Sequence, residues 1–156
     1  VDEKTDLSSL VNAKNKFQYV INNFPESDFA SDSKYKIDLI NDILASKEMY
    51  IGRHYIKKQK WIAAINRFKI VTKDYDTTVY VEEAIHRLVE IYYILGIETE
   101  AKKYANLLGY NYQSSKWYER SFSVFNKNYK KNKIKDIKKE NNSILKKFKS
   151  LFSWDE

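Results

Sequence analysis

The feature that most constrains this chain is the stretch of residues 48–76, in which small and large apolar side chains recur at helical spacing. Gly52 and Tyr55 lie three residues apart, and Ala64 and Phe68 lie four apart. Residues at these spacings share one face of an α-helix, so each pair places a small side chain beside an aromatic one. Small side chains let two helices approach closely, and aromatic ones fill the space between them. The stretch therefore predicts two helices packed as a hairpin.

A seven-residue pattern recurs where such helices are expected to end. It consists of Asn or Asp, an aromatic residue, two turn residues, Ser or Thr, any residue, and a final aromatic residue, and its copies begin at Asn23, Asp74 and Asn111. The Ser or Thr hydroxyl is suited to cap the next helix, because it can accept hydrogen bonds from unpaired N–H groups there. The first interval between copies is the longer, which predicts an extended helix over residues 31–58.

Recurring helical hairpins indicate an all-α, TPR-like fold (tetratricopeptide repeat), a solenoid whose unit is about 34 residues long. Only three Gly and one Pro occur in 156 residues, which favours long helices over a sheet with many tight turns. We expect a polar lead-in over residues 1–10, a repeat domain over 11–129 that is part of a longer protein, and a Lys-rich helix or tail over 130–156. Helices are predicted over residues 11–24, 31–58 (one helix, or two that meet near Ala45), 61–73, 80–95, 98–108 and 117–129.

The sequence offers little for catalysis. It contains no cysteine, and its three glycines are too dispersed to form a phosphate-binding loop. A nucleophile elbow and paired catalytic carboxylates are also missing from the sequence, so we expect no enzyme activity and no cofactor. Glu82, His86 and Glu90 lie four residues apart on one predicted helix face, a spacing that can hold zinc. Ion pairs on a solvated face are the commoner origin of such spacing, and we expect no metal site.

The net charge is +7, and ten lysines fall between residues 127 and 149. A composition rich in Lys, Asn, Ile and Tyr is one explanation of this charge, and an acidic partner, an anionic membrane or a nucleic acid is the other. An apolar seam interrupted by Asn141 runs from Ile134 to Leu151. The segment can therefore be an amphipathic helix that caps the last hairpin, a helix that lies on anionic lipid, or a flexible basic tail.

Three segments go beyond a generic repeat pattern: residues 54–55 (HY), 61–67 (WIAAINR) and 88–92 (LVEIY). With their surroundings, from about Val11 to Phe125, they resemble the BamD (ComL-type) outer-membrane assembly lipoproteins. The resemblance implies a periplasmic TPR scaffold that is lipid-anchored to the inner leaflet of the outer membrane. Proteins of this family work in the complex that inserts β-barrel proteins, and their C-terminal repeats dock onto a POTRA domain of the barrel subunit BamA.

The resemblance also implies which residues make that contact. The family's Arg in the Ala-Ile-Asn-Arg segment is associated with BamA, and it falls on Arg67 here. A guanidinium suits the role, because its planar fork can bind a carboxylate in bidentate fashion. The alternative for Arg67 is an ordinary surface or intramolecular ion pair. Asp74, Asp76, Glu82 and Glu83 are nearby acidic candidates for other partner contacts.

Two parts stay outside the resemblance. The family's lipidated N-terminus and first repeats, which are expected to meet unfolded barrel substrates, are expected to lie outside this chain. The Lys-rich segment matches no family motif. Two other functions remain open: an unrelated TPR adaptor that holds a peptide in its concave groove, and a basic module that binds RNA or a membrane surface through the Lys-rich segment. The scaffold interpretation involves no nucleic acid.

Overall fold

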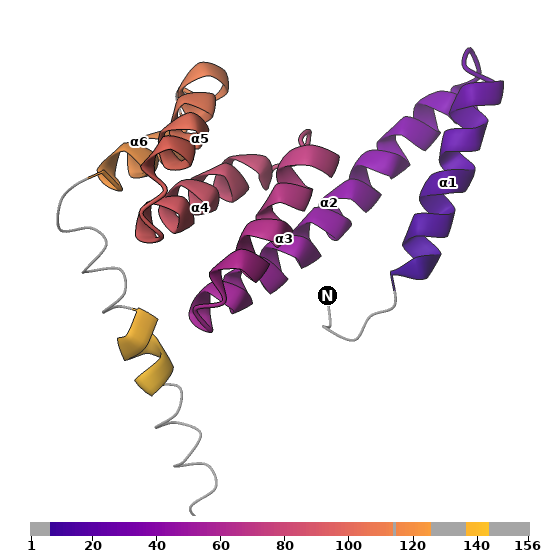
Figure 1. Ribbon diagram of the computed structural model, residues 1–156. Helices are drawn as coiled ribbons and strands as arrows, with labels where there is room; N and C mark the ends of the chain where they lie inside the picture. Colours follow the sequence, from indigo (N-terminus) through magenta and orange to yellow (C-terminus); the bar gives the residue numbers. More distant parts are fainter. Residues whose placement is uncertain (1–6, 114, 126–136, 144–156) are drawn as a thin grey trace, which may run out of the picture.

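The computed structural model describes residues 7–113, 115–125 and 137–143, which form helices joined by short turns (Figure 1). Each helix packs against the next along the chain, and the last one packs against the two before it. The described residues contain no strand, which confirms the predicted all-α, TPR-like fold. In this part of the chain, no helix has the length and apolar character needed to cross a bilayer. The helices are α1 (Ser8–Asn23), α2 (Asp28–Lys57), α3 (Trp61–Asp74), α4 (Val81–Ile94), α5 (Glu98–Asn111) and α6 (Lys116–Ser123).

The helix bounds lie within three residues of the predicted ranges, except that α6 ends earlier. Helix α2 runs unbroken for 30 residues, so the extended helix is confirmed and there is no break near Ala45. Helix α1 begins at Ser8, inside the predicted lead-in. Helix α6 ends at Ser123, earlier than expected, and residues 126–129 of its predicted range lie outside the described residues.

The core of the central hairpin depends on a close approach between α2 and α3. The Phe68 ring is fully buried and lies against Gly52. A Cβ atom added at Gly52 would lie 2.7 Å from both Cε1 and Cζ of that ring, closer than real Cβ contacts allow. The predicted close approach of the two helices is therefore present, and the contact between Gly52 and Phe68 sets the distance between them.

Replacing this glycine tests the close approach. We expect Gly52→Ala to lower the free energy of unfolding by about 1–3 kcal/mol, because the buried Phe68 ring must move. Urea unfolding measures the change. The matched control is Gly109→Ala, where the nearest atom is the Cε2 of the partly exposed Tyr118 ring at 3.0 Å, and a smaller loss is expected there. Equal or higher stability of Gly52→Ala, as helix propensity alone would give, would contradict this account.

The turns between hairpins repeat the same backbone geometry. Phe24, Tyr75 and Tyr112 end their helices with φ values of −136°, −136° and −140°, and each donates its N–H to the carbonyl four residues before it. These turns are the recurring seven-residue pattern. In each of the three copies, therefore, the aromatic residue ends a helix with the same backbone geometry.

The predicted hydroxyl caps are confirmed at two of the three turns. Ser27 accepts from the Ala30 N–H at 3.2 Å, and Ser115 accepts from the Trp117 N–H at 3.1 Å. The prediction is wrong for Thr78, because α4 begins only at Val81 and its cap has no side-chain hydrogen bond. The buried Thr78 hydroxyl instead donates to the Tyr75 carbonyl at 2.7 Å and closes the turn.

The turns inside the two hairpins place one residue each in the left-handed region. Gly96 has a φ of +80° at the end of α4, and Gln59 has a φ of +56° at the end of α2. The residue after each donates its N–H to the carbonyl five positions earlier, a common way to satisfy helix-end carbonyls. Glycine adopts this conformation without strain, whereas Gln59 carries a Cβ there.

We therefore expect Gln59→Gly to raise the free energy of unfolding by about 0.5–1 kcal/mol, because it relieves the left-handed strain. Thermal unfolding followed by circular dichroism measures the change. Gln59→Ala keeps the Cβ and serves as the control, with stability expected to stay near that of the parent chain. Destabilisation by the glycine would show that the turn is not strained.

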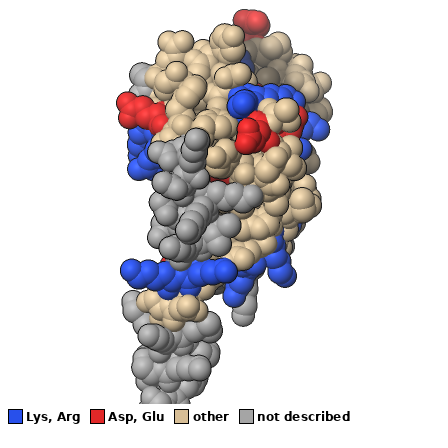
Figure 2. Space-filling view, turned by 60° about the vertical axis from the view of Figure 1, so that its left-hand side comes forward, with Lys and Arg blue, Asp and Glu red and all other residues tan. Residues whose placement is uncertain are grey.

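A helical segment over residues 137–143 packs against the end of the α2–α3 hairpin (Figure 1). Ile137 is 6% exposed and belongs to the main apolar core. Lys57 of α2 pairs with Glu140 at 2.9 Å, and its carbonyl accepts from Asn141. Lys and Arg side chains gather at this end of the molecule (Figure 2). Residues 137–143 thus form a helix that packs on the central α2–α3 hairpin, not on the last hairpin as the capping interpretation expected, and the other residues of the Lys-rich segment lie outside the described ones.

Candidate partner-binding site

Arg67 lies on α3 in an ion pair with Glu48 of α2. Its Nη1 lies 3.1 Å and 3.4 Å from the two Glu48 carboxylate oxygens. The arginine side chain is 36% exposed and the glutamate side chain 19%. The neighbouring positions Ala64 and Phe68 are buried, so Arg67 stands at the rim of the interface between the two helices. The structure thus contains the intramolecular pair that was the alternative for this residue, and it leaves the guanidinium accessible from one side.

Asp74 and Tyr75 belong to the same neighbourhood as the Arg67–Glu48 pair. Burial raises the pKa of the Tyr75 phenol, and the carboxylates of Glu48 and Asp74 raise it further. The Lys14 ammonium lies 5.7 Å from the centre of the Tyr75 ring, which brings α1 to this surface as well. Asp74 itself is exposed. The Tyr75 phenol therefore feels the charge of Asp74 and of Glu48, the partner of Arg67.

Asp76 and Glu82 lie in a second neighbourhood, at the turn before α6. Glu82 accepts a hydrogen bond from the Ser115 hydroxyl. Burial raises the pKa of Tyr112, and Glu82 and Asp76 add to the effect. Glu82, Tyr112 and Ser115 also line a surface pocket of about 680 Å³. Asp76 is exposed, whereas Glu82 is half-buried and already holds the residue that caps α6.

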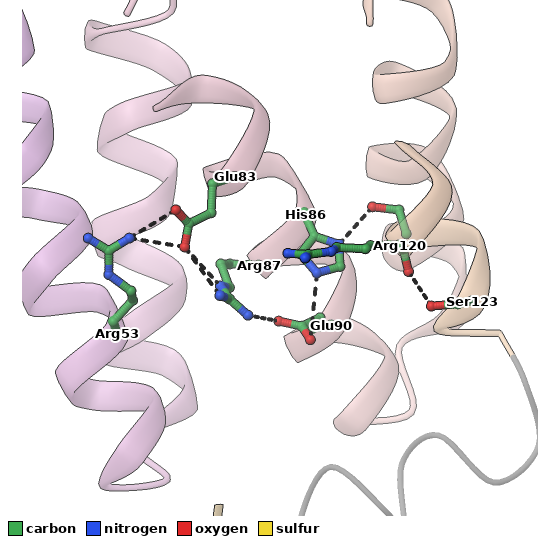
Figure 3. Close-up of polar contacts among 8 residues, drawn as sticks. Arg53, Glu83, His86, Arg87, Glu90, Arg120 and Ser123 are labelled. Carbon is green, nitrogen blue, oxygen red and sulfur yellow. Dashed lines mark hydrogen bonds and ion pairs between the residues drawn. The ribbon is translucent and has the colours of Figure 1, made fainter. Parts of the chain in front are cut away.

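Glu83 takes part in a third arrangement, a chain of ion pairs that joins α2 to α4 (Figure 3). Arg53 of α2 donates from Nη1 to both Glu83 oxygens, at 2.9 Å and 3.0 Å. Arg87 donates to the same carboxylate at 3.2 Å and to Glu90 at 2.6 Å. Burial alone would lower the pKa of Arg87, but the Glu90 and Glu83 carboxylates outweigh it and raise the pKa. Glu83 is thus engaged in the packing of helices.

The chain of pairs continues to α6 through buried groups. His86 and Glu90 are each 3% exposed, and their side chains lie 3.7 Å apart. The Nδ1 atom of His86 lies 2.9 Å from the hydroxyl of Ser121, which is fully buried. The expectation of ion pairs on a solvated face is therefore wrong for His86 and Glu90, because α6 covers them. Within the described residues, no group of three His, Cys, Asp or Glu side chains could hold a metal ion.

Trp117 completes this region, and its role was missed in the sequence. The indole ring lies 5.2 Å from the His86 ring, measured between ring centres. Three cationic groups lie within 6 Å of its centre: the Arg120 guanidinium at 4.7 Å, the Lys116 ammonium at 5.6 Å and the Arg87 guanidinium at 5.7 Å. Cations over an indole face are attracted by its quadrupole. The sequence signal was the aromatic residue that ends the third copy of the pattern.

Removing the central cation of this region should be costly. We expect Arg87→Ala to lower the free energy of unfolding by about 3 kcal/mol, because Glu90 would lose its charged partner in a buried position. Adding Glu90→Gln to that variant should restore part of the loss, because the buried charge is then removed as well. Urea unfolding of the two variants measures both effects. A loss that is equal in the single and double variants would show that charge burial is not its cause.

The stacked helical hairpins define a class of protein. A stack of helical hairpins with ion-paired side chains on its faces is typical of scaffold proteins that bind other proteins. Comparison with known proteins agrees with this class: residues 1–108 match the family model described as YfiO, outer membrane lipoprotein. The chain belongs to this family.

Curated relatives support the same assignment. The outer membrane protein assembly factor BamD of Rickettsia prowazekii is 51% identical over 128 residues, which cover 82% of this chain and 51% of the relative. The protein of the same name from Caulobacter vibrioides is 40% identical over 128 residues, covering 82% and 42%. The chain thus spans about half the length of these relatives. The resemblance to the BamD lipoproteins is confirmed. These relatives are assembly factors, which is a non-enzymatic role.

Proposed function

We propose that this chain is part of a non-catalytic TPR scaffold subunit of the machinery that assembles β-barrel proteins in the outer membrane. In this proposal it docks onto a periplasmic POTRA domain of the barrel subunit BamA, and the complete protein is held at the periplasmic face of the membrane by a lipid anchor. Family membership supports the place in outer-membrane assembly. The geometry of Arg67 is the observation that supports the docking face.

Arg67 is suited to exchange its internal partner for a partner on another protein. Only Nη1 takes part in the hydrogen bonds to Glu48 described above, so other N–H groups of the guanidinium can bind a second carboxylate. The pair is partly solvated, at 36% and 19% exposure, so its rearrangement costs little. An arginine whose side chain is held in place but not fully buried is a frequent centre of binding energy at interfaces.

The four acidic candidates fall into two groups, according to whether their side chains already have partners within the chain. Asp74 and Asp76 are exposed, and they can meet basic groups of a partner. Glu82 and Glu83 hold internal partners, Ser115 for the first and Arg53 with Arg87 for the second. A partner contact at either glutamate would have to compete with these bonds. The proposed interface is therefore centred on Arg67, with Asp74 at its side and Asp76, Glu82 and Glu83 towards its edge.

A charge reversal tests this interface directly. Arg67→Glu should weaken binding to the isolated periplasmic domains of BamA from the same source by about 30-fold or more, the effect of losing one central contact. Helicity and melting temperature should stay close to those of the parent chain. Surface plasmon resonance or calorimetry measures the affinity, and circular dichroism measures the fold.

Two further variants serve as controls. Lys73→Glu makes the same charge change at an exposed position on the same helix and should leave binding nearly unchanged. Glu48→Gln removes the charge that pairs with Arg67 and should preserve or strengthen binding. Normal affinity of Arg67→Glu would remove Arg67 from the interface. Failure of the well-folded parent chain to bind would place the docking surface elsewhere in the complete protein.

A further inference from the structure

The docking of residues 137–143 satisfies a backbone group that α2 cannot satisfy itself. The last four carbonyls of a helix have no partner within it. In α2 the carbonyls of His54, Tyr55 and Ile56 accept from amides of the following turn. The fourth, that of Lys57, accepts from the Asn141 side-chain amide at 2.6 Å.

This bond explains the one polar position in the apolar seam of the Lys-rich segment. Ile137 and Asn141 lie four residues apart, on the same face of the segment, and Ile137 enters the core while Asn141 binds the end of α2. The bond from Asn141 is exposed to solvent, so it adds one contact at the end of α2 to the burial of Ile137. Glu140, one residue away, adds an ion pair to Lys57 at 2.9 Å. The segment is therefore held in one position.

The docked position brings lysines from two distant parts of the sequence to one edge of the molecule. Lys58 and Lys60 lie in the exposed turn that follows α2, and Lys138 and Lys139 are exposed on the segment docked against that turn. The clustering of cationic side chains at this end is visible in Figure 2. We call these four residues the basic edge. Their ammonium groups carry four positive charges, and the paired Lys57 and Glu140 add none.

We propose that residues 137–143 act as a latch that assembles the basic edge, and that this edge binds an anionic phospholipid surface. Lysine ammonium groups interact with the phosphates of lipid headgroups mainly through charge, so several on one edge add up without a shaped pocket. Membership in an outer membrane lipoprotein family favours a lipid surface over RNA as the anionic partner. The proposal is independent of the BamA interface, which is centred on Arg67.

Vesicle sedimentation tests the lipid part. The chain should bind phosphatidylcholine vesicles that contain phosphatidylglycerol, bind pure phosphatidylcholine vesicles far more weakly, and lose binding as salt is raised. Each lysine near an anionic surface contributes about five-fold, so replacing all four residues of the basic edge by glutamine should weaken binding by two to three orders of magnitude, roughly. The control replaces four exposed lysines elsewhere and should change binding much less. Its positions are Lys16, Lys34, Lys69 and Lys73.

A charge-neutral variant tests the latch. Ile137→Asn combined with Asn141→Ala removes the core contact and the backbone hydrogen bond without changing any lysine, and leaves only the exposed Lys57–Glu140 ion pair. Hydrogen exchange should show loss of protection over residues 137–143, and circular dichroism should show that the other helices persist. Binding should fall by about 25-fold, because two of the four lysines leave the edge.

Four results would overturn the proposal. Full vesicle binding by the undocked variant would mean that the lysines act as a basic tail rather than as an assembled edge. Equal losses in the basic-edge and control variants would leave net charge as the only cause. Equal binding to neutral vesicles would show that binding does not depend on the charge of the lipid headgroups. Single-stranded RNA bound through the basic edge, with no vesicle binding, would identify a nucleic acid as the partner instead.

Discussion

The position of α4 is the constraint on which the rest of this structure depends. Helices α3, α5 and α6 all pack against it, and ten of its fourteen residues are buried. A helix covered on so many sides cannot keep its polar side chains in water, so those that remain must be paired. Arg87 therefore lies between Glu83 and Glu90. The same pairs reach Arg53 on α2, so the burial of one helix also sets the orientation of its neighbours.

These constraints explain how much of the fold can be predicted from sequence. Local signals were sufficient for the helices and turns: Phe24, Tyr75 and Tyr112 end three helices with one geometry because each sits at the same place in the same seven-residue pattern. Spacing also predicted a close approach of the two helices, but the structure was needed to show that Phe68 is the residue that packs on Gly52. Thr78 shows the limit, because its hydroxyl closes a turn while the following helix starts three residues later.

The candidate site was less predictable, since burial depends on elements that are distant in the sequence. Glu82, His86 and Glu90 recur every four residues, and that spacing is the same on a solvated face and on a covered one. The packing of α6 gives these residues different surroundings. Ser121 of α6 contacts His86, whereas Ser115, which caps α6, donates a hydrogen bond to Glu82. The pair of Arg53 with Glu83 spans 30 positions and has no local signal at all. Sequence periodicity identifies the helices, and tertiary packing decides which charges are structural.

Arg87, which pairs with glutamates of its own helix, and Arg67, which pairs with a glutamate of the neighbouring helix, illustrate how a scaffold can separate stability from binding. Arg87 is 20% exposed and lies between two carboxylates, one of them buried, so its removal leaves a charge that water cannot reach. Arg67 is 36% exposed and pairs with one partly solvated carboxylate, so water or another protein can replace that partner at small cost. Both use the same chemical group, and the depth of burial determines its role. The charged network around Arg87 is therefore part of the packing of the stack, whereas the Arg67–Glu48 pair at the rim can exchange its partner.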